Sequence, residues 1–386
     1  MRSMPETKRI GILLHPVRTY CRRVLRGITT VGARARWELL LVSADVDPLL
    51  DTLSKDFLHG VIGHFSEEAL LRQVANARLP AVDVAPLDRD GQFVRVTTDE
   101  LAVGRLAAAH LLSLGLPHFG FFGTQRHYHS LLREQGFRQS IEAAGLSSHV
   151  MLDGADAHSQ SGASGHELEQ WLSQLPKPIG VMASTDSRAL QLLAVCRKLQ
   201  IDVPRSLAVL GVDNDDVFCE TANPPLSSIA LSTQRIGYEA ARVLEDLMQG
   251  KKPDQQQILI PPAGVVPRRS SDLPALVDAD VAAAVRYIAL HVQDDLQVAD
   301  VLREVPVSRT SLEQKFRRVL GRTPAAEIRR AQIEVAKTLL SQTEEPMSNV
   351  ARAAGFSNAK QLGTTFHRET GMTPTAYRHA SRAPMK

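Results

Sequence analysis

The sequence predicts an α/β body in two lobes with parallel sheets, followed by an all-α tail that carries two helix-turn-helix motifs. In the body, short apolar runs alternate with amphipathic helical stretches between residues 8 and 262. This alternation is typical of parallel sheets covered by helices on both faces. The length of the body favours two lobes over one. Beyond a proline-rich stretch, the remaining sequence shows only helical periodicity.

The expected strands of the body are short and mostly apolar. They occupy residues 9–14, 39–42, 60–62, 81–84, 93–96, 118–122, 150–152, 179–183, 207–211, 228–231 and 257–260. Helices fill the gaps, for example at residues 101–114, 131–144, 187–199 and 236–249. Short strands separated by helices indicate repeated βαβ units, and hence parallel sheets.

A change of composition separates the body from the tail. Pro261 and Pro262 are followed by Val266-Pro267-Arg268-Arg269-Ser270-Ser271-Asp272-Leu273-Pro274, which has prolines and polar residues without periodicity. Such a stretch is typical of an interdomain linker. We therefore expect a two-lobed α/β domain at residues 1–262, a linker at 263–279 and a helical domain at 280–386.

The tail contains the same helix-turn-helix pattern twice. Leucine and phenylalanine four residues apart fall on one helix face, glycine favours a left-handed stop, and threonine before proline caps the next helix. The order L-x3-F-x4-G-x-T-P is formed by Leu312, Phe316, Gly321, Thr323 and Pro324, and again by Leu362, Phe366, Gly371, Thr373 and Pro374. A helix is expected at 282–291 at the start of the tail. The first motif is expected to consist of helices 298–302 and 308–319, and the second of helices 348–353 and 358–369. A long helix at 324–341 is expected to connect the two motifs.

The tail is basic and the body is acidic. Residues 306–386 carry 14 Lys and Arg against 6 Asp and Glu, whereas the rest of the chain carries 31 against 36. A basic helical module attached to an acidic body is expected of a protein that binds nucleic-acid phosphates at one end.

Other classes of protein find little support in the sequence. No apolar run reaches the roughly 18 residues needed to cross a bilayer, and the first residues lack an apolar signal core, so we expect a cytoplasmic protein with no membrane partner. Cys21, Cys196 and Cys219 are far apart and form no metal or redox motif. His127 and His129 lack a third ligand. Because catalytic and nucleotide-binding motifs are also missing, we expect no enzyme, no metal and no cofactor.

A series of short motifs runs along the body. It comprises Thr98-Asp99-Glu100-Leu101-Ala102-Val103-Gly104, Ala108-Ala109-His110-Leu111, Arg133-Glu134-Gln135-Gly136-Phe137, Ser184-Thr185-Asp186, Gly211-Val212-Asp213-Asn214 and Pro225-Leu226-Ser227-Ser228-Ile229. In order and spacing this series resembles the LacI/GalR regulators and the periplasmic sugar-binding proteins over nearly all of residues 8–262. The resemblance implies a periplasmic-binding-protein-like sensor.

The tail shows a second resemblance. Its motifs are Gly321-x-Thr323-Pro324, Ala336-x-x-Leu339-Leu340, Gly355-Phe356-Ser357 and Gly371-x-Thr373-Pro374-x-x-Tyr377-Arg378. They resemble the AraC/XylS-type DNA-binding domain. A LacI-like sensor in front of an AraC-type tail is the arrangement of the bacterial xylose operon activators. Tyr20-Cys21-Arg22-Arg23 and Arg268-Arg269-Ser270-Ser271-Asp272 are similar to segments of that family.

The resemblance implies a monosaccharide site in the cleft between the two lobes. A sugar offers many hydroxyls and no charge, so carboxylates, amides and arginines suit it. In open α/β sheets, ligands lie beyond the carboxyl ends of the strands. By resemblance, Asp213 and Asp186 are the main expected ligands. The further candidates are Asn214, Arg133, Asp99, Arg188, Tyr20 and Arg22.

The residues alone leave other interpretations open. Asp99 suits a helix N-cap as well as a ligand site. Asp213 and Asn214 also fit a solvated acidic turn, and Arg188 also fits a surface position.

The second helix of each helix-turn-helix motif is expected to enter the major groove. In the first motif, Leu312 and Phe316 face inward. We therefore expect the residues on the opposite face of the helix to contact bases or phosphates. The candidates there are Arg309, Thr310, Glu313, Arg317 and Arg318, and in the second motif Asn358, Lys360, Gln361, Thr364, Thr365 and Arg368. Arg309 suits a guanine and Glu313 a cytosine amine, whereas Lys315 and Arg318 suit phosphates.

The expected function is therefore that of a sugar-responsive transcriptional activator of pentose genes. Its expected partners are double-stranded DNA, a sugar such as D-xylose, RNA polymerase and a second copy of the chain. Two alternatives remain: a repressor or regulator that responds to another sugar or small metabolite, and an α/β enzyme.

Overall fold

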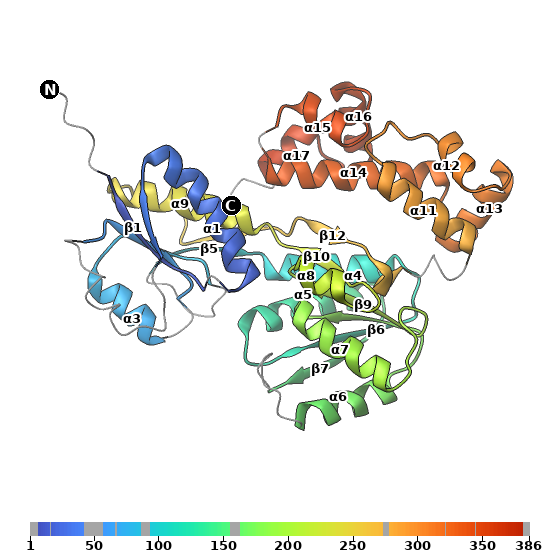
Figure 1. Cartoon of the computed structure of the whole chain (residues 1–386), viewed down its shortest axis with the longest axis horizontal. Coiled ribbons are helices and arrows are strands. Elements are labelled where there is room, and N and C mark those ends of the chain that lie inside the picture. Colours follow the sequence, from blue (N-terminus) through green and yellow to red (C-terminus); the bar gives the residue numbers. More distant parts are fainter. Residues whose placement is uncertain are drawn as a thin grey trace. The chain divides into compact units, whose positions relative to one another are not determined.

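The computed structural model describes residues 7–15, 17–41, 57–65, 68–85, 93–154, 163–272, 278–320, 322–343 and 345–380. The chain forms two compact units. Unit 1 contains residues 1–99 and 232–261, and unit 2 contains residues 100–231 and 262–383. Each unit holds one six-stranded sheet among the described residues, and residues 262–383, which include the helical tail, are part of unit 2. Figure 1 labels the elements of both sheets and of the tail.

Unit 1 is a parallel sheet between helices. The strand order is β11-β5-β4-β3-β1-β2, and the pairings given for this sheet are all parallel. Its strands are β1 (Arg9–Leu13), β2 (Glu38–Leu41), β3 (Gly60–Gly63), β4 (Ala81–Asp83), β5 (Val94–Thr98) and β11 (Gln257–Ile260). Its helices are α1 (Thr19–Ala35), α3 (Glu68–Ala77) and α9 (Thr233–Met248).

Neighbouring residues of one strand show how this sheet is covered. Ile62 packs in a cluster with Val24 of α1 and Ile236 of α9, whereas Val61 packs in another cluster with Val74 of α3. Because side chains alternate along a strand, α1 and α9 cover one face and α3 covers the other, as Figure 1 shows.

The sheet of unit 2 has the order β12-β10-β9-β8-β6-β7. Its strands are β6 (His118–Thr124), β7 (Ser148–Asp153), β8 (Ile179–Ala183), β9 (Leu207–Val212), β10 (Ser227–Ala230) and β12 (Gly264–Val266). Its helices are α4 (Glu100–Leu112), α5 (Tyr128–Ala143), α6 (Ala163–Gln174), α7 (Asp186–Lys198), α8 (Asp216–Thr221) and the short 3-10 helix η1 (Arg269–Ser271). Val181 packs with Leu172 of α6 and Leu192 of α7. A side chain at Gly180 would point toward Leu111 of α4, which therefore covers the opposite face.

One boundary differs from the prediction. The first part of the expected linker at 263–279 is regular structure, because β12 pairs antiparallel with β10 and η1 follows it. A three-residue strand at the edge of a sheet has no periodicity to detect, which is why the sequence did not predict it. Residues 273–277 lie outside the described residues.

The tail contains the two expected helix-turn-helix motifs. Its helices are α11 (Ala279–His291), α12 (Val298–Glu304), α13 (Arg309–Leu320), α14 (Pro324–Gln342), α15 (Met347–Ala353), α16 (Ala359–Thr370) and α17 (Pro374–Ala380). Thr323 caps α14, since its hydroxyl accepts a hydrogen bond from the Ala326 amide. Gly371 ends α16 with a left-handed φ of 74°. The corresponding Gly321 lies outside the described residues.

The central helix α14 contributes to two separate hydrophobic clusters. Ile328 packs with Leu312 and Phe316 of the first motif. Five residues further along, Ile333 packs with Leu362 and Phe366 of the second motif. The fold class predicted from the sequence is thus confirmed in both parts. Within the described ranges, no helix is both long enough and apolar enough to span a bilayer.

Candidate functional site

Polar side chains gather at the carboxyl ends of the strands in the sheet of unit 2. Asp153 ends β7, Ser184 follows β8, Asp213 follows β9, and Ser228 lies in β10. In an open parallel sheet this edge is where ligands bind. These residues define the candidate site.

Arg133 is held at this site by two hydrogen bonds from its guanidinium group. Its Nε donates to Glu100 Oε2 at 2.6 Å, and its Nη1 donates to the Ser184 carbonyl oxygen at 2.5 Å. Arg133 and Glu100 are only 3% and 4% exposed. A buried guanidinium needs such partners, because an unpaired buried charge is strongly destabilising.

A close approach of two helices positions this pair. A side chain at Gly104 of α4 would lie 2.2 Å from the Arg133 carbonyl oxygen, and one at Gly136 of α5 would lie 2.3 Å from the Leu101 carbonyl oxygen. Only glycine fits at both positions. The two backbones can therefore approach closely enough for Arg133 of α5 to reach Glu100 of α4.

Asp213 occupies the turn directly after β9. Its backbone has a φ of 111° and its amide donates to the Ile229 carbonyl oxygen at 3.0 Å. Burial raises the pKa of Asp213, and the negative charges of Asp186 and Glu100 act in the same direction, while Arg133 opposes them. The positive φ is uncommon for a residue other than glycine and is a form of strain found at functional sites.

Asp186 is buried and already bonded to the protein. Its Oδ1 accepts from the Ser228 hydroxyl at 2.6 Å, and its Oδ2 accepts from the Asp215 amide at 2.8 Å and from Cys219 Sγ at 3.4 Å. Burial raises the pKa of Asp186. Its contacts are those of a residue that holds the loop after β9, whereas the sequence predicted a direct ligand.

Asn214 and Arg188 also differ from simple surface residues. The Asn214 amide donates to Ser228 Oγ at 3.0 Å, and its Oδ1 accepts from Arg268 Nη1 at 2.9 Å. Arg188 is 2% exposed. It forms an ion pair with Asp153, and its guanidinium lies 5.4 Å from the centre of the Phe122 ring. The surface interpretation of Arg188 is therefore wrong.

Two buried oxygen atoms at this edge of the sheet lack a hydrogen-bond partner among the described residues. They are Ser184 Oγ and Asp153 Oδ1. Buried polar groups in folded proteins are nearly always hydrogen-bonded, so these atoms are suited to the hydroxyls of a ligand. The sequence did not point to Asp153, and Glu100 belonged to a recognised motif, residues 98–104, in which only Asp99 was singled out. Ser184 belonged to a recognised motif, Ser184-Thr185-Asp186, in which only Asp186 was singled out.

The remaining three candidates belong to unit 1. The Tyr20 hydroxyl donates to the Val84 carbonyl oxygen at 3.2 Å. Arg22 donates to the Val17 carbonyl oxygen and to the Thr19 hydroxyl. Asp99 follows β5, is 8% exposed, and its amide donates to the Ile260 carbonyl oxygen at 2.8 Å. The structure brings Arg133, Asp186, Arg188, Asp213 and Asn214 together in unit 2.

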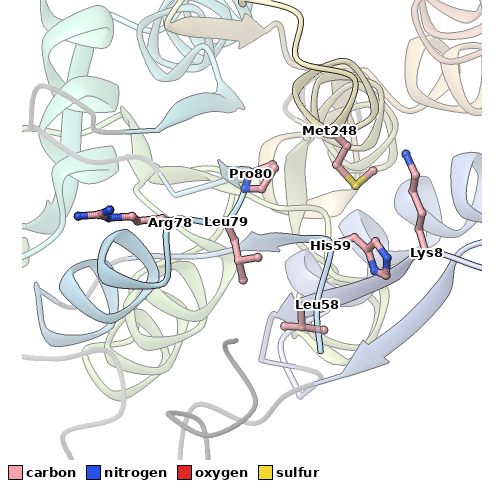
Figure 2. Close-up of a pocket in the computed structure, with 7 residues that line it drawn as sticks. All are labelled: Lys8, Leu58, His59, Arg78, Leu79, Pro80 and Met248. Carbon is pink, nitrogen blue, oxygen red and sulfur yellow. The ribbon is translucent and has the colours of Figure 1, made fainter. Parts of the chain in front are cut away.

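Unit 1 also has a pocket of about 310 Å³, shown in Figure 2. Lys8 and His59 directly precede β1 and β3, and Pro80 precedes β4, so the pocket lies at the amino ends of these strands. The Lys8 and Arg78 side chains point away from each other (Figure 2). This pocket lacks the carboxylates and amides that suit a sugar and lies at the wrong end of the sheet.

In the first helix-turn-helix motif, the exposed face of α13 carries Arg309, Thr310 and Arg317. Arg309 Nε donates to Glu313 Oε1 at 3.2 Å, which is a pair between neighbouring turns of one helix. Such an exposed pair contributes little to stability, so both side chains are available to base edges.

Two basic residues of α13 contact acids of the same domain. Arg318 Nη2 lies 2.8 Å from Asp278 Oδ2, and Lys315 Nζ lies 3.2 Å from Asp278 Oδ1 and also contacts Asp280. The phosphate role predicted for Lys315 is not supported by these contacts, because this side chain is half-buried against two carboxylates. Arg318 remains exposed.

In the second motif, one of the candidate DNA-binding residues is buried. Thr365 is 9% exposed and belongs to the inner face of α16, three residues after Leu362 and one before Phe366. Asn358 caps α16, because its Oδ1 accepts from the Gln361 amide, and Gln361 Oε1 in turn accepts from the Ser357 amide. The exposed candidates on this helix are Lys360, Gln361, Thr364 and Arg368.

His127 and His129 stack with ring centres 5.3 Å apart. In the part of the chain that the structure describes, no group of three or more potential ligands could hold a metal ion.

Comparisons with known proteins agree with both parts of the fold. A model of a periplasmic binding protein-like domain matches residues 108–271, and a model of a helix-turn-helix domain matches residues 301–380. The solved structure of a xylose-binding transcription activator is 28% identical, with a TM-score of 0.63, and the match covers 97% of this chain and 99% of that one.

The curated relatives match over almost the full length. The xylose operon regulatory protein of Haemophilus influenzae is 30% identical over 380 residues, which cover 96% of this chain and 98% of the relative. The protein of the same name from Escherichia coli strain K12 is 29% identical over 387 residues, which cover 98% of each. The resemblance predicted from the sequence motifs is confirmed, and the chain belongs to the family of xylose operon regulatory proteins.

Proposed function

We propose that this chain is a transcription activator of xylose genes that binds D-xylose at the candidate site of unit 2 and binds DNA through α13 and α16. The observation that carries the sugar assignment is the arrangement around Arg133. Its guanidinium is held between Glu100 and Ser184, and its charge acts on the nearby carboxyl of Asp213. A fixed donor beside a carboxylate suits two neighbouring hydroxyls of a sugar.

The charge of the site favours a neutral ligand. Four carboxyl groups, those of Glu100, Asp153, Asp186 and Asp213, accompany two guanidinium groups, those of Arg133 and Arg188. Each guanidinium is already paired with a carboxylate, so the site has no surplus positive charge to hold a phosphorylated sugar or another anion. The buried Ser184 Oγ, which lacks a partner among the described residues, offers a further contact for a hydroxyl.

We assign different roles to the predicted ligand residues. Asp213, Arg133 and Asn214 contact the sugar directly. Asp186 positions the loop that carries Asp213, and Arg188 positions Asp153. Tyr20, Arg22 and Asp99 of unit 1 are further proposed contacts on the strength of the family resemblance.

Isothermal titration calorimetry tests the sugar assignment. We expect D-xylose to bind with measurable heat, and we expect xylose 5-phosphate to bind at least about tenfold more weakly, which is a difference of about 1.4 kcal/mol in binding free energy. Asp213→Asn tests the site, with Asp202→Asn, an exposed acid of the same unit, as the matched control. Absence of heat with every pentose and hexose would exclude a sugar sensor.

The tail has the dimensions for two neighbouring half-sites on DNA. Helix α14 has 19 residues, so at roughly 1.5 Å per residue it spans about 28 Å. This length approaches the roughly 34 Å between successive major-groove turns. We propose that α13 and α16 enter adjacent turns on one face of the duplex, and that the activator works as a dimer that contacts RNA polymerase.

A salt series tests DNA binding, and sedimentation tests the dimer. Binding through phosphates weakens steeply as salt rises, so a DNA affinity independent of salt would contradict the proposal. Sedimentation equilibrium of the full chain, with and without D-xylose, gives the oligomeric state. Reporter transcription with purified polymerase distinguishes activation from repression.

A further inference from the structure

Residues 264–272, which we call the exit segment, lead from the α/β body toward the DNA-binding tail. The segment contains β12 and η1. Strand β12 pairs antiparallel with β10, so that Ser228 lies opposite Val266. The exit segment is therefore an integral part of the sheet that carries the candidate sugar site.

Arg268 ties the exit segment to the sugar site. Its Nη1 donates to Asn214 Oδ1 at 2.9 Å and to the Leu226 carbonyl oxygen at 3.0 Å. Asn214 follows Asp213 directly in the turn after β9. Any movement of this turn on ligand binding therefore acts on Arg268.

Serine hydroxyls hold the remainder of the exit segment to the sheet. Ser227 Oγ accepts from the Arg268 amide at 2.7 Å and from Ser271 Oγ at 2.8 Å. Ser270 Oγ donates to the Val209 carbonyl oxygen at 2.7 Å. His110 of α4 bonds to Ser271 Oγ at 3.0 Å. These bonds fix the point from which the chain leaves the sheet.

The next described residue, Asp278, is anchored to the first DNA-recognition helix. It caps α11, because its Oδ1 accepts from the Asp280 amide. Its carboxylate also contacts Lys315 and Arg318 of α13. Only residues 273–277, which lie outside the described residues, separate this anchor from the exit segment.

We propose that Arg268 is a positioning residue that couples the sugar site to recognition helix α13, through the exit segment and Asp278. The coupling rests on the proposed function, because it requires a ligand at Asp213 and Asn214. Asn214 Oδ1 accepts from Arg268 Nη1 and has a second lone pair for a sugar hydroxyl. A sugar that binds this oxygen draws on the same side chain that holds Arg268, which gives a ligand-free and a ligand-bound arrangement. A ligand that favours one of them shifts the position of the exit segment, from which the chain continues to Asp278.

The test measures the coupling factor, defined as the ratio of the DNA dissociation constants without and with D-xylose. A coupling free energy of 1–3 kcal/mol corresponds to a factor of roughly 5–150. In Arg268→Ala, we expect this factor to fall to about 1, while the D-xylose dissociation constant stays within about threefold of the wild-type value. Arg269→Ala is the matched control, since this neighbouring arginine is exposed and carries the same charge.

Asp278→Asn tests the other anchor. Asparagine caps a helix as well as aspartate does, so α11 is retained, whereas the charge that faces Lys315 and Arg318 is lost. We expect a reduced coupling factor with unchanged sugar affinity. If Arg268→Ala does not fold, Arg268→Lys keeps the charge but replaces the planar guanidinium with a single ammonium group, and the coupling factor is expected to fall by at least half.

An unchanged coupling factor in the folded Arg268 variant would overturn the inference. Loss of sugar binding in that variant would also overturn it, because Arg268 would then belong to the ligand site itself. A wild-type chain that binds no sugar would refute the proposed function instead, and calorimetry of the wild type identifies that case separately.

Discussion

Arg133 and Glu100 form a buried ion pair, in which Nε of the arginine lies 2.6 Å from Oε2 of the glutamate. The pair joins α5 to α4 at the edge of the sheet where Asp213 lies. Removing one partner leaves the other as an uncompensated buried charge, whereas removing both charges together leaves no such buried charge.

Arg133→Met is therefore expected to lower the free energy of unfolding by about 3–5 kcal/mol. Adding Glu100→Gln to this variant should restore part of the loss. Urea unfolding monitored by Trp171 reports on this unit, because its ring lies 6.3 Å from Phe122. Trp37 is replaced by Phe throughout, so that the signal comes from one tryptophan. Strictly additive effects of the two substitutions would contradict a coupled pair.

Asp213→Asn should abolish sugar binding and yet stabilise the ligand-free protein. Burial raises the pKa of Asp213 in the folded state, so its ionised form is disfavoured by folding. The sign follows from proton linkage: the folded state binds more protons, so the stability of the wild type declines as pH rises above about 4, the ordinary pKa of the group. The variant lacks this decline.

Thermal melts across pH 5–8 check this prediction. The variant should melt higher than the wild type, by an amount that grows with pH, at about 2–4 °C per kcal/mol. Asp202→Asn, which removes an exposed charge, should show no such trend. A gap that shrinks as pH rises would show that the carboxylate is stabilised, not destabilised, by its surroundings.

Elements with strong local patterns were predictable from the sequence, and roles that depend on distant partners were not. The strand at Ile179–Ala183 is a continuous apolar run, and the helix at Pro324–Gln342 has a threonine cap and a proline at its start. The hydrogen bonds of the Asp186 oxygens to the Ser228 hydroxyl and the Asp215 amide could not be predicted from the sequence. These partners come from strands and turns that only the fold brings together.

The error at Thr365 has a different cause. It lies three residues after Leu362 in sequence, and residues three apart share a helix face. Helical periodicity was expected to place it on the outward face together with Thr364, but in the structure it lies at the inner edge, where it is 9% exposed. The pairing of Glu100 with Arg133 could not be predicted because the two residues are 33 positions apart in sequence. No local pattern links residues at that separation.

His110 should make the stability of the protein decrease in acid. Burial lowers the pKa of His110 to about 4, and the positive charge of Arg330 acts in the same direction. The unfolded state then binds more protons than the folded state between about pH 6.5 and 4. Stability from this residue is present at neutral pH and is lost as pH falls through that interval.

His110→Asn removes this titration and keeps a polar group near Ser271 Oγ, 3.0 Å from the histidine ring nitrogen. The wild type should lose more stability than the variant between pH 7 and pH 5 in parallel urea titrations. His149→Asn serves as the control, because His149 is an exposed histidine on β7 of the same sheet. Parallel pH profiles for wild type and His110→Asn would rule out the role.

Arg309→Ala should relax sequence preference, whereas Lys360→Ala should weaken binding to all sequences. Arg309 lies in the first turn of α13, whose early residues face base edges, and a bidentate contact with guanine is worth about 1–3 kcal/mol. Lys360 is an exposed cation at the start of α16, where a phosphate contact adds about 1 to the salt slope. Binding-site selection followed by salt titrations separates the two effects. Equal losses on specific and scrambled DNA for Arg309→Ala would show that it contacts only phosphate.

The two hydrophobic clusters of the tail should unfold independently of each other. Phe316 packs with Leu312 and Ile328, and Phe366 packs with Leu362 and Ile333, so each aromatic ring supports one motif. Truncating a buried phenylalanine costs about 3–5 kcal/mol. Because the described residues form two separate clusters that both draw on α14, Phe366→Ala should disorder α16 and leave α13 folded.

Footprinting on DNA obtained by binding-site selection gives the readout. Phe366→Ala should lose protection over one half-site and keep it over the other, and Phe316→Ala should show the reverse pattern. Thr364→Ala, an exposed substitution on the same helix as Phe366, should keep both footprints at protein concentrations raised to compensate for weaker binding. If either phenylalanine variant loses both half-sites while α14 stays helical by circular dichroism, the motifs fold as one cooperative unit and cannot bind DNA independently.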